Sequence, residues 1–497
     1  MFEKFILQPF IESTKQFERS NAFCINEKFY TYKELAISIS NIRRALQNQN
    51  IRSKNIGLVV NDDLETYAAI FAIWLEGYAY VPLHPQQPLE RSLKIMTQTD
   101  VDLIIDSSVK SKFTANTVIN SFRLATEEGV YLNPKSAPAD ALAYIIFTSG
   151  STGEPKGVQI TRMNLGSFIK SFWEVGFHID QNDRCLQCFD LTFDVSVQSY
   201  LVPLTRGACA YTMPHNQIRY SHIYGLLENH KMTFGAMASS MIRYLRPYFN
   251  EINISSMRYN ILAAEASPLD LIIEWSKCIP NAEIYDFYGP TEATIYCTYS
   301  KFIKEGDNKH FNGMLSIGKP MNGINAIIID DEKRALSKNQ KGELCVSGYQ
   351  ITPGYWKNEE KNAEYFFEIK EGNTIKRFYK TGDLCYFDED GDIMLAERLD
   401  NQVKIQGYRV ELGEIEYHAK KFLAGQDAVA VTYSVKNGSN EIALFVEGEL
   451  SNNYELLEYL KIKIPPYMIP SKIIVKDKFP LNTSGKTDRI ALKNLIQ

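Results

Sequence analysis

The chain of 497 residues lacks several kinds of segment, and each absence excludes a class of protein. No apolar run is long enough to cross a membrane, and charged residues interrupt the first apolar stretch too early for a signal peptide. There is no long basic run: 54 Lys and Arg stand against 59 Asp and Glu, a formal charge of −5. We therefore expect a soluble cytoplasmic protein that binds neither nucleic acid nor a membrane.

Cysteine is scarce and scattered: eight residues in the whole chain. In a cytoplasmic protein this favours free thiols over a disulfide framework. The one C-x-x-C pair, Cys185 and Cys188, has neither a second pair nor nearby histidine ligands. We expect that pair to pack in a strand or in the core, not to bind a metal.

Internal repeats and low-complexity tracts are absent as well, so domain boundaries must come from a change of pattern. Helical patterns alternate with short apolar runs through the first two-thirds of the chain, which predicts an α/β fold around a largely parallel sheet. The pattern becomes β-rich from about residue 320 and α+β from Asp400. We predict a large N-terminal domain over 1–399 and a small α+β domain over 400–497.

A strand-like run leads into a loop of Gly, Ser and Thr in "YIIFTSGSTGEPKGVQI", residues 144–160. Gly150 and Gly153 leave backbone N–H groups accessible, and Lys156 adds a positive charge, so the loop is suited to phosphate. It is not a Walker A loop, because Gly157 follows the lysine where Ser or Thr is required. A surface turn rich in small residues is the alternative, which a block of this length directly after a strand disfavours.

The segment "FTSGSTGEPKG" resembles the adenylate-forming superfamily, which includes acyl-CoA synthetases, luciferases and the adenylation domains of nonribosomal peptide synthetases. Other motifs of that family stand in the family's order along nearly the whole chain. They are "TYKEL" (31–35), "AYVPLHP" (79–85), "DFYGPTEATI" (286–295), "GELCVSGYQITPGYW" (342–356), "YKTGDL" (379–384), "NQVKIQGYRVELGEIE" (401–416), "PPYMIP" (465–470) and "NTSGKTDR" (482–489).

The resemblance implies a large adenylate-forming domain of layered sheets with a β-rich subdomain, followed by a small mobile lid. It also implies a reaction: ATP and Mg²⁺ activate a carboxylate as an acyl-adenylate with release of pyrophosphate, and the acyl group then passes to a thiol. The residues that would bind ATP are Thr148, Ser149, Gly150, Ser151, Thr152, Gly153, Lys156, Ala264, Glu265, Ala266, Asp286, Phe287, Tyr288, Gly289, Pro290, Thr291, Asp383, Arg398, Lys404 and Lys486.

Particular roles follow from the same resemblance. Tyr288 would stack on adenine and Asp286 would accept from its amino group. Asp383 would accept from the ribose hydroxyls, with Arg398 beside the same sugar. The catalytic set would be Thr291 at the α-phosphate, Glu292 holding Mg²⁺, and Lys486.

The lid would act through three positions. Lys486 would bridge the substrate carboxylate and the α-phosphate, an attraction of roughly 4 kcal/mol at about 4 Å. Asp400 would be the hinge of the lid, and Gly407 would line the tunnel of the incoming thiol.

The acid to be activated is expected to be an amino acid. Asp194 stands where amino-acid-activating relatives hold the substrate ammonium, and a lipid or aryl acid would leave such a buried carboxylate without a cation. The substrate-binding residues read by register are Asp194, Val195, Gln198, Ala236, Ile261, Ala263, Phe287, Ile295, Tyr296 and Lys486. This set resembles the L-proline pattern, departing from it at Phe287 and Tyr296, and D-alanine is the rival substrate.

The acceptor is expected to be the phosphopantetheine thiol of a separate carrier protein, because no carrier-type segment follows the last motif. The resemblance is closest to free-standing L-proline:peptidyl-carrier-protein ligases. Two alternatives stay open: a carboxylic acid:CoA ligase, and a catalytically silent nucleotide-binding scaffold.

Overall fold

The computed structural model describes residues 1–150, 153–213, 219–372, 374–400, 402–435, 439–450, 452–481 and 487–496. The chain forms two compact units. The large unit contains residues 1–85, 96–146 and 157–399, and the small unit contains residues 86–95, 147–156 and 400–497. The sequence pattern predicts one domain over all of 1–399, whereas here two segments of that range group with the C-terminal residues.

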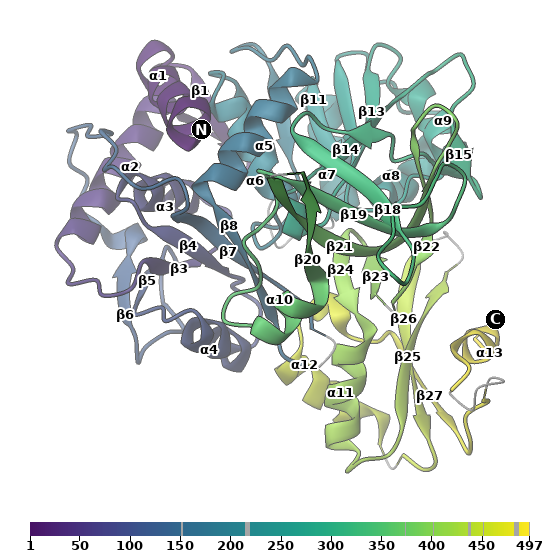
Figure 1. Ribbon diagram of the computed structural model, residues 1–497. Helices are drawn as coiled ribbons and strands as arrows, with labels where there is room; N and C mark the ends of the chain where they lie inside the picture. The colour runs from purple at the N-terminus through teal and green to yellow at the C-terminus, as the bar shows by residue number, and fades with distance from the viewer. Residues whose placement is uncertain are drawn as a thin grey trace. The chain divides into compact units, whose positions relative to one another are not determined.

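The largest sheet of the large unit has nine strands, and its centre is parallel (Figure 1). In spatial order they are β17 (Lys319–Pro320), β14 (Thr298–Phe302), β13 (Glu283–Tyr288), β12 (Tyr259–Leu262), β11 (Phe234–Met237), β9 (Arg184–Gln187), β10 (Cys209–Thr212), β1 (Asn21–Ile25) and β2 (Lys28–Thr31). The outer strands β14, β17 and β2 pair antiparallel. The parallel centre agrees with the predicted α/β alternation.

The second sheet has six strands, and its pairings β3–β4, β3–β5, β4–β7 and β5–β6 are parallel. Its order is β6 (Thr117–Asn120), β5 (Leu103–Asp106), β3 (Asn55–Val59), β4 (Ala79–Leu83), β7 (Leu142–Thr148) and β8 (Lys156–Thr161). One hydrophobic core, running from Phe2 to Ile393 in the sequence, includes residues of both sheets. The two sheets therefore belong to a single folded body.

Local side-chain contacts and burial account for two helices of the large unit. α2 (Tyr32–Gln47) starts at a capping box, in which Thr31 accepts from Glu34 N–H and the Glu34 carboxylate accepts from Thr31 N–H. α3 (Leu64–Leu75) is apolar on all sides and almost wholly buried. The others are α1 (Gln8–Gln16), α4 (Leu89–Gln98), which starts in the small unit, α5 (Arg162–Glu174), α6 (Val195–Leu204), α7 (Arg219–Asn229), α8 (Ser239–Leu245), α9 (Leu269–Cys278) and α10 (Glu359–Tyr365).

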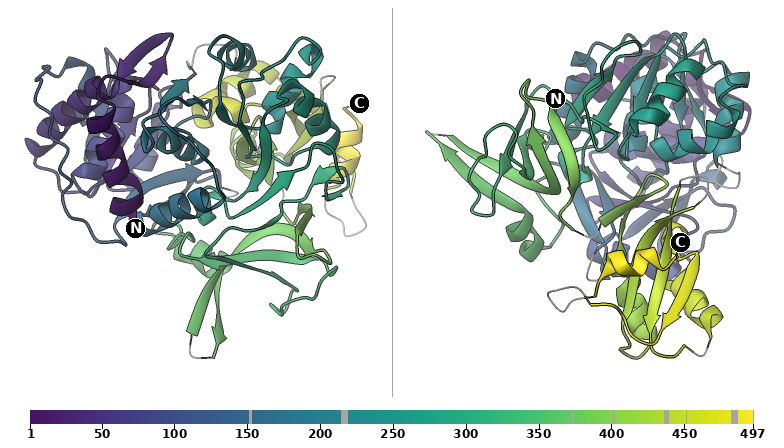
Figure 2. Two further views of the ribbon diagram at one scale, coloured as in Figure 1. Left: turned by 90° about the horizontal axis from the view of Figure 1, so that it is seen from above. Right: turned by 90° about the vertical axis from the view of Figure 1, so that its right-hand side faces the viewer.

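The predicted β-rich stretch forms a third, antiparallel sheet (green strands in Figure 2). It contains β18 (Ile324–Ile329), β19 (Gly342–Gly348), β21 (Thr374–Phe387) and β20 (Phe366–Glu371), and β22 (Ile393–Arg398) pairs with β21. The β21–β22 register sets Asp383 opposite Arg398. This sheet therefore brings together the two residues predicted for the ribose.

The small unit is α+β, as predicted. It has a hairpin of β23 (Gln402–Ile405) and β24 (Tyr408–Glu411), and a sheet of β25 (Ala428–Ser434), β26 (Asn440–Glu447) and β27 (Lys472–Lys476). Helices α11 (Leu412–Phe422), α12 (Asn453–Lys463) and α13 (Arg489–Asn494) complete it. Its apolar residues form their own clusters, separate from the core of the large unit.

All eight cysteines are buried with free thiols, and Cys185 lies in β9 with Cys188 just after it. Within the described residues, no helix is both long enough and apolar enough to cross a membrane.

Candidate active site

The carboxyl ends of β12 and β13 meet at one edge of the large sheet, where Leu262 pairs with Asp286. The chain that leaves β12, residues 263–267, turns back onto this edge, because Ser267 Oγ donates to Asp286 at 2.9 Å. The Glu265 carboxylate accepts from Ser240 N–H at 2.8 Å. Ala264 to Ala266, predicted from sequence to bind nucleotide, thus lie in the segment held against Asp286. Ligands of open α/β sheets commonly bind at such an edge.

Tyr288, the last residue of β13, connects this edge to the third sheet. Its hydroxyl donates to the Asp383 carboxylate, which also pairs with Arg398 Nη1 at 3.0 Å. Burial, and then the charge of Asp383, raise the pKa of Tyr288 well above its usual value, so the hydroxyl keeps its proton and stays a donor. The residues predicted for adenine and for ribose therefore adjoin each other.

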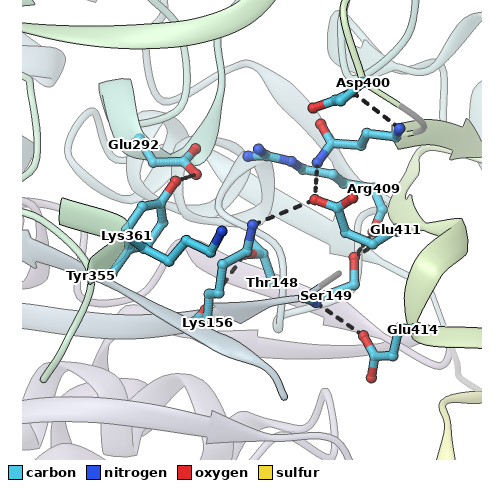
Figure 3. Close-up of polar contacts among 12 residues, drawn as sticks. Thr148, Ser149, Lys156, Glu292, Tyr355, Lys361, Asp400, Arg409, Glu411 and Glu414 are labelled. Carbon is cyan, nitrogen blue, oxygen red and sulfur yellow. Dashed lines mark hydrogen bonds and ion pairs between the residues drawn. The ribbon is translucent and has the colours of Figure 1, made fainter. Parts of the chain in front are cut away.

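Glu292 lies in a short 3-10 turn (Thr291–Ala293) after β13 and is fully buried. Its carboxylate accepts from the Tyr355 hydroxyl at 2.7 Å (Figure 3). No group of three or more His, Cys, Asp or Glu in the described ranges could hold a metal by itself. A single buried carboxylate does fit Mg²⁺, which takes one or two carboxylates and keeps water and nucleotide phosphates as its other ligands.

Four residues predicted for the amino-acid substrate lie on one face of the large sheet. Ala236 of β11 pairs in register with Ile261 of β12, and the ladder continues through Ala263, whose N–H bonds the Met237 carbonyl at 3.1 Å. One position beyond the Leu262–Asp286 pair, Ala263 is beside Phe287. Because side chains alternate along a strand, Ala236, Ile261, Ala263 and Phe287 share a face. No sequence motif near Ala236 fixes its alignment with the other substrate residues. The strand pairing shows that it lies beside Ile261.

Asp194 precedes α6, and Gln198 follows one helical turn later on the same side. Asp194 is 7% exposed, and Gln198 is fully buried. Burial raises the pKa of Tyr80, Tyr144 and Tyr296, and for each of them the charge of Asp194 raises it further. The Asp194 carboxylate is therefore near three buried tyrosines, one of which is the predicted substrate residue Tyr296. Val195, the first residue of α6, is also buried.

The turn after β13 holds its substrate residues in a strained backbone. Ile295 has φ 74° and Thr294 φ 57°, and positive φ is rare for β-branched residues. A Cβ on Gly289 would lie 2.5 Å from the carbonyl oxygen of Ile295, so only glycine fits where the turn folds back. Gln350 fixes the turn from outside by donating to the Tyr296 carbonyl at 2.8 Å. Such strain is found mostly at functional sites.

The predicted phosphate loop belongs to the small unit and is bonded to the hairpin there (Figure 3). Ser149 Oγ accepts from Glu411 N–H at 2.9 Å and donates to the Arg409 carbonyl at 3.2 Å. Gly150 N–H donates to the Glu414 carboxylate at 3.1 Å, and Lys156 Nζ is 3.4 Å from Glu411 Oε1. The loop thus offers a backbone N–H and a lysine to anionic oxygens, here two carboxylates of the chain itself.

Gly153 and Thr148 complete the described part of that loop. Gly153 has φ +79°, and a Cβ there would lie 2.2 Å from the Tyr417 ring. Thr148 Oγ1 is 3.4 Å from the Lys156 carbonyl, which closes the loop at its base. Ser151, Thr152 and Lys486 lie outside the described residues.

The predicted hinge and thiol positions lie at the two ends of the hairpin. Asp400 accepts from Gln402 N–H at 3.1 Å just before β23. Gln406 and Gly407 form a two-residue turn, both with positive φ, as a type I′ turn requires. Gly407 is therefore at the tip of the hairpin, and Lys404 is exposed on β23 opposite Arg409.

Several residues of this site received no role from the sequence: Tyr355, Ser267, Glu411 and Glu414. Tyr355 stands in "GELCVSGYQITPGYW", and both glutamates stand in "NQVKIQGYRVELGEIE". These motifs marked the regions, but no local pattern paired Tyr355 with Glu292, which precedes it by 63 residues.

The amino-acid sequence is similar to those of known proteins. A family model described as AMP-binding enzyme matches residues 10–356. A linear gramicidin synthase of Brevibacillus parabrevis is 32% identical over 99% of this chain, which covers 10% of that protein. Tyrocidine synthase 1 of the same organism is 28% identical over 98% of this chain, which covers 45% of that protein. The chain therefore spans less than half the length of these relatives.

Solved structures share the fold. The Vibrio cholerae adenylation domain AlmE, in complex with glycyl-adenosine-5'-phosphate, has a TM-score of 0.85 at 23% identity and covers 98% of this chain and 97% of its own. PA1221, an NRPS protein containing adenylation and PCP domains, has a TM-score of 0.83 at 22% identity and covers 98% of this chain and 83% of its own.

Proposed function

This chain belongs to the family of AMP-binding enzymes, and from that premise we propose that it activates an amino acid. ATP converts the amino-acid carboxylate into an aminoacyl-adenylate with release of pyrophosphate. The aminoacyl group then passes to the phosphopantetheine thiol of a carrier protein. The relatives that are synthases for gramicidin and tyrocidine, and the solved structure with a PCP domain, support this direction.

The observation that carries the proposal is the buried carboxylate of Asp194. It lies at the start of a buried helix, with the apolar side chains of Ile261 and Phe287 also in the core. A charge that is removed from water needs an opposite charge or several hydrogen bonds. The α-ammonium of an amino acid would pair with this carboxylate, whereas a fatty or aryl acid brings no cation to it. This favours an amino-acid substrate over that of a carboxylic acid:CoA ligase.

The remaining roles are assigned to the ATP side of the reaction. Asp286 and Tyr288 hold adenine, Asp383 and Arg398 hold ribose, and the loop from Thr148 to Lys156 binds phosphate. Glu292 holds Mg²⁺ when it is bound, and the ion neutralises charge on the phosphates. Attack at the α-phosphate brings two anions together, so cations and donors are what the site must provide. Lys486 is proposed to bridge the two reacting groups, with Asp400 as the hinge and Gly407 beside the thiol.

L-proline is the first candidate substrate, because Asp194, Val195, Gln198, Ile261 and Ala263 resemble the proline pattern. D-alanine is the second. The small side chains of Ala236 and Ala263 and the large rings of Phe287 and Tyr296 together favour a small substrate side chain.

Amino-acid-dependent exchange of labelled pyrophosphate into ATP tests the proposal. We expect exchange with a small amino acid and none with its deamino analogue, such as cyclopentanecarboxylic acid in place of proline. Asp194→Asn keeps the shape and removes the charge, so kcat/KM for the amino acid should fall by roughly 100-fold or more. The Kd for ATP should be unchanged. Equal exchange with amino and deamino acids would contradict the proposal.

A further inference from the structure

We propose that the substrate side chain carries a hydrogen-bonding group, and that Gln198 and Tyr296 bind it. The inference rests on the amino-acid activation proposed above and narrows its substrate class. It predicts a small amino acid with a hydroxyl or amide in its side chain in preference to an apolar one of the same size, and so it ranks 4-hydroxyproline above L-proline and serine above alanine among the candidates.

The first observation is a pair of buried polar groups. Gln198 is fully buried in α6, and neither its amide nitrogen nor its amide oxygen has a hydrogen-bond partner among the residues that the structure describes. Tyr296 is 1% exposed, and its hydroxyl likewise has no partner in that part of the chain. Folded proteins pair the large majority of their buried polar atoms, so an exception of this kind requires an explanation.

Gln187 of the same chain is a buried glutamine whose amide is bonded by the protein, and it serves as a comparison for Gln198. Gln187, 1% exposed at the end of β9, donates to the Phe189 carbonyl at 2.8 Å and accepts from Phe189 N–H at 3.2 Å. The amide of Gln187 is thus bonded through both of its polar atoms by the protein itself. Gln198 is at least as buried, and the described part of the protein provides it with neither bond.

The second observation is the location of the two groups. Gln198 lies one turn after Asp194 on α6, and the hydroxyl of Tyr296 is close enough to Asp194 for the carboxylate to raise its pKa further. The Tyr296 ring packs between Phe287 at 5.0 Å and Phe168 at 5.9 Å, measured between ring centroids. The two polar groups therefore belong to the region proposed for the substrate, which also contains the Asp194 carboxylate and the apolar rings of Phe287 and Phe168.

The third observation is chemical. Gln198 offers two donors and one acceptor, and the Tyr296 hydroxyl offers one of each. An apolar ring or methyl group would leave all of them unpaired when it displaced water. A site built to bond a hydroxyl or an amide rejects the analogue that lacks it far more strongly than an apolar site rejects an added hydroxyl. Discrimination should therefore favour the polar member of each pair, including 4-hydroxyproline over proline.

Pyrophosphate exchange with matched pairs tests this: threonine and valine, serine and alanine, 4-hydroxyproline and proline, asparagine and leucine. We expect the best substrate to be a polar member, with kcat/KM at least about 10-fold above that of its apolar partner. If the best substrate is the apolar member of a pair, or if the ratio of kcat/KM values is near one in every pair, the inference is wrong. Either result would leave amino-acid activation intact. No exchange with any amino acid would instead refute the proposed function and this inference with it.

Two variants test whether Gln198 and Tyr296 cause the preference for polar substrates. Tyr296→Phe and Gln198→Leu should each bring the ratio of kcat/KM for the polar substrate to kcat/KM for its apolar partner toward one. Tyr285→Phe is the matched control, because its hydroxyl bonds Glu283 at 2.7 Å in the same strand as Phe287, and the ratio should not change.

The melting temperature of the ligand-free variants provides a second measurement. Since no protein group bonds these atoms within the described ranges, Tyr296→Phe should melt no lower than the wild type. A clear drop for Tyr296→Phe, with an unchanged ratio, would mean that the hydroxyl serves the fold and would overturn the inference.

Discussion

Single phenol groups orient the carboxylates of the candidate site. Tyr288 donates to Asp383, and Tyr355 donates to Glu292, each from a different part of the chain. Burial keeps the Tyr288 proton in place by raising its pKa. A carboxylate oriented in this way presents its remaining lone pairs in a fixed direction, which is what a sugar hydroxyl or a metal ion requires.

Tyr355→Phe tests this orientation at Glu292. Removing one hydroxyl should weaken the use of Mg²⁺, because groups that orient a metal ligand typically contribute about 10- to 100-fold to affinity or activity. Pyrophosphate exchange measured against Mg²⁺ concentration should show a higher half-saturating concentration. Tyr299→Phe, a hydroxyl deletion in the aromatic cluster of β13 and β14, is the control and should leave it unchanged. An unaltered Mg²⁺ dependence in Tyr355→Phe would contradict the assignment.

The motif residues can be predicted one by one, but most of their partners cannot. Asp383, Glu292 and Lys156 follow from "YKTGDL", "DFYGPTE" and "FTSGSTGEPKG" because short motifs have a fixed order. Lys156 and Glu411 are 255 residues apart, and nothing in either motif names the other. Contacts of that length depend on the assembled fold, whereas sequence patterns report local structure.

At the scale of elements, the tight turn after β13 determines where Ile295 and Tyr296 point. Gly289 allows the chain to approach itself, and Thr294 donates its hydroxyl to the Gln350 carbonyl. The positive φ values of Thr294 and Ile295 are not predictable from sequence, because both residue types normally avoid that region.

Gly289→Ala should disturb this turn. The new methyl group would collide with backbone atoms that cannot move aside, at a cost of about 1–3 kcal/mol. We expect a lower melting temperature and at least a roughly 10-fold loss in kcat/KM for the amino acid, because the turn positions substrate residues. Gly225→Ala in α7, where the nearest atom is 3.8 Å away, is the control and should be neutral or slightly stabilising. Equal behaviour of the two variants would contradict the account of the turn.

In the small unit, the predicted phosphate loop and the β23–β24 hairpin are joined by an ion pair. Glu411 pairs with Lys156 and also accepts from Gln402 at 2.8 Å. If Lys156 serves ATP, Glu411 competes with phosphate for it. Glu411→Gln should therefore lower the KM for ATP by roughly 2- to 10-fold in pyrophosphate exchange. Glu458→Gln, on the surface of α12, removes the same charge without touching the loop and should change nothing. A KM for ATP that rises or stays constant would refute the competition.

At the scale of the whole molecule, stability should depend on pH through His418 of α11. Burial, and then the charges of Lys94, Arg91, Lys463 and Lys421, lower its pKa from 6.5 to about 4. Between these values the unfolded chain binds a proton that the folded protein does not. The free energy of unfolding should therefore fall as the pH is lowered from about 6.5 to about 4. The loss is on the order of 1–2 kcal/mol once solvent screening of this half-buried group is allowed for.

Denaturant unfolding of the full chain at several pH values measures this contribution. His418→Gln removes the titrating group and should flatten the curve in that range. His310→Gln, in the exposed β15 (His310–Phe311), is the control and should keep the wild-type slope. Parallel curves for all three proteins would contradict the assignment.

The buried cysteines make the protein suited to site-specific labelling. All eight thiols are buried, and burial raises the pKa of Cys24 and Cys278 to about 11, so at neutral pH they are protonated as well as shielded. Tyr349→Cys and Tyr454→Cys would place new thiols at side chains that are 74% and 66% exposed, one on each unit. Because maleimide dyes would react with these two positions first, energy transfer between them could follow the separation of the units as ATP and amino acid are added.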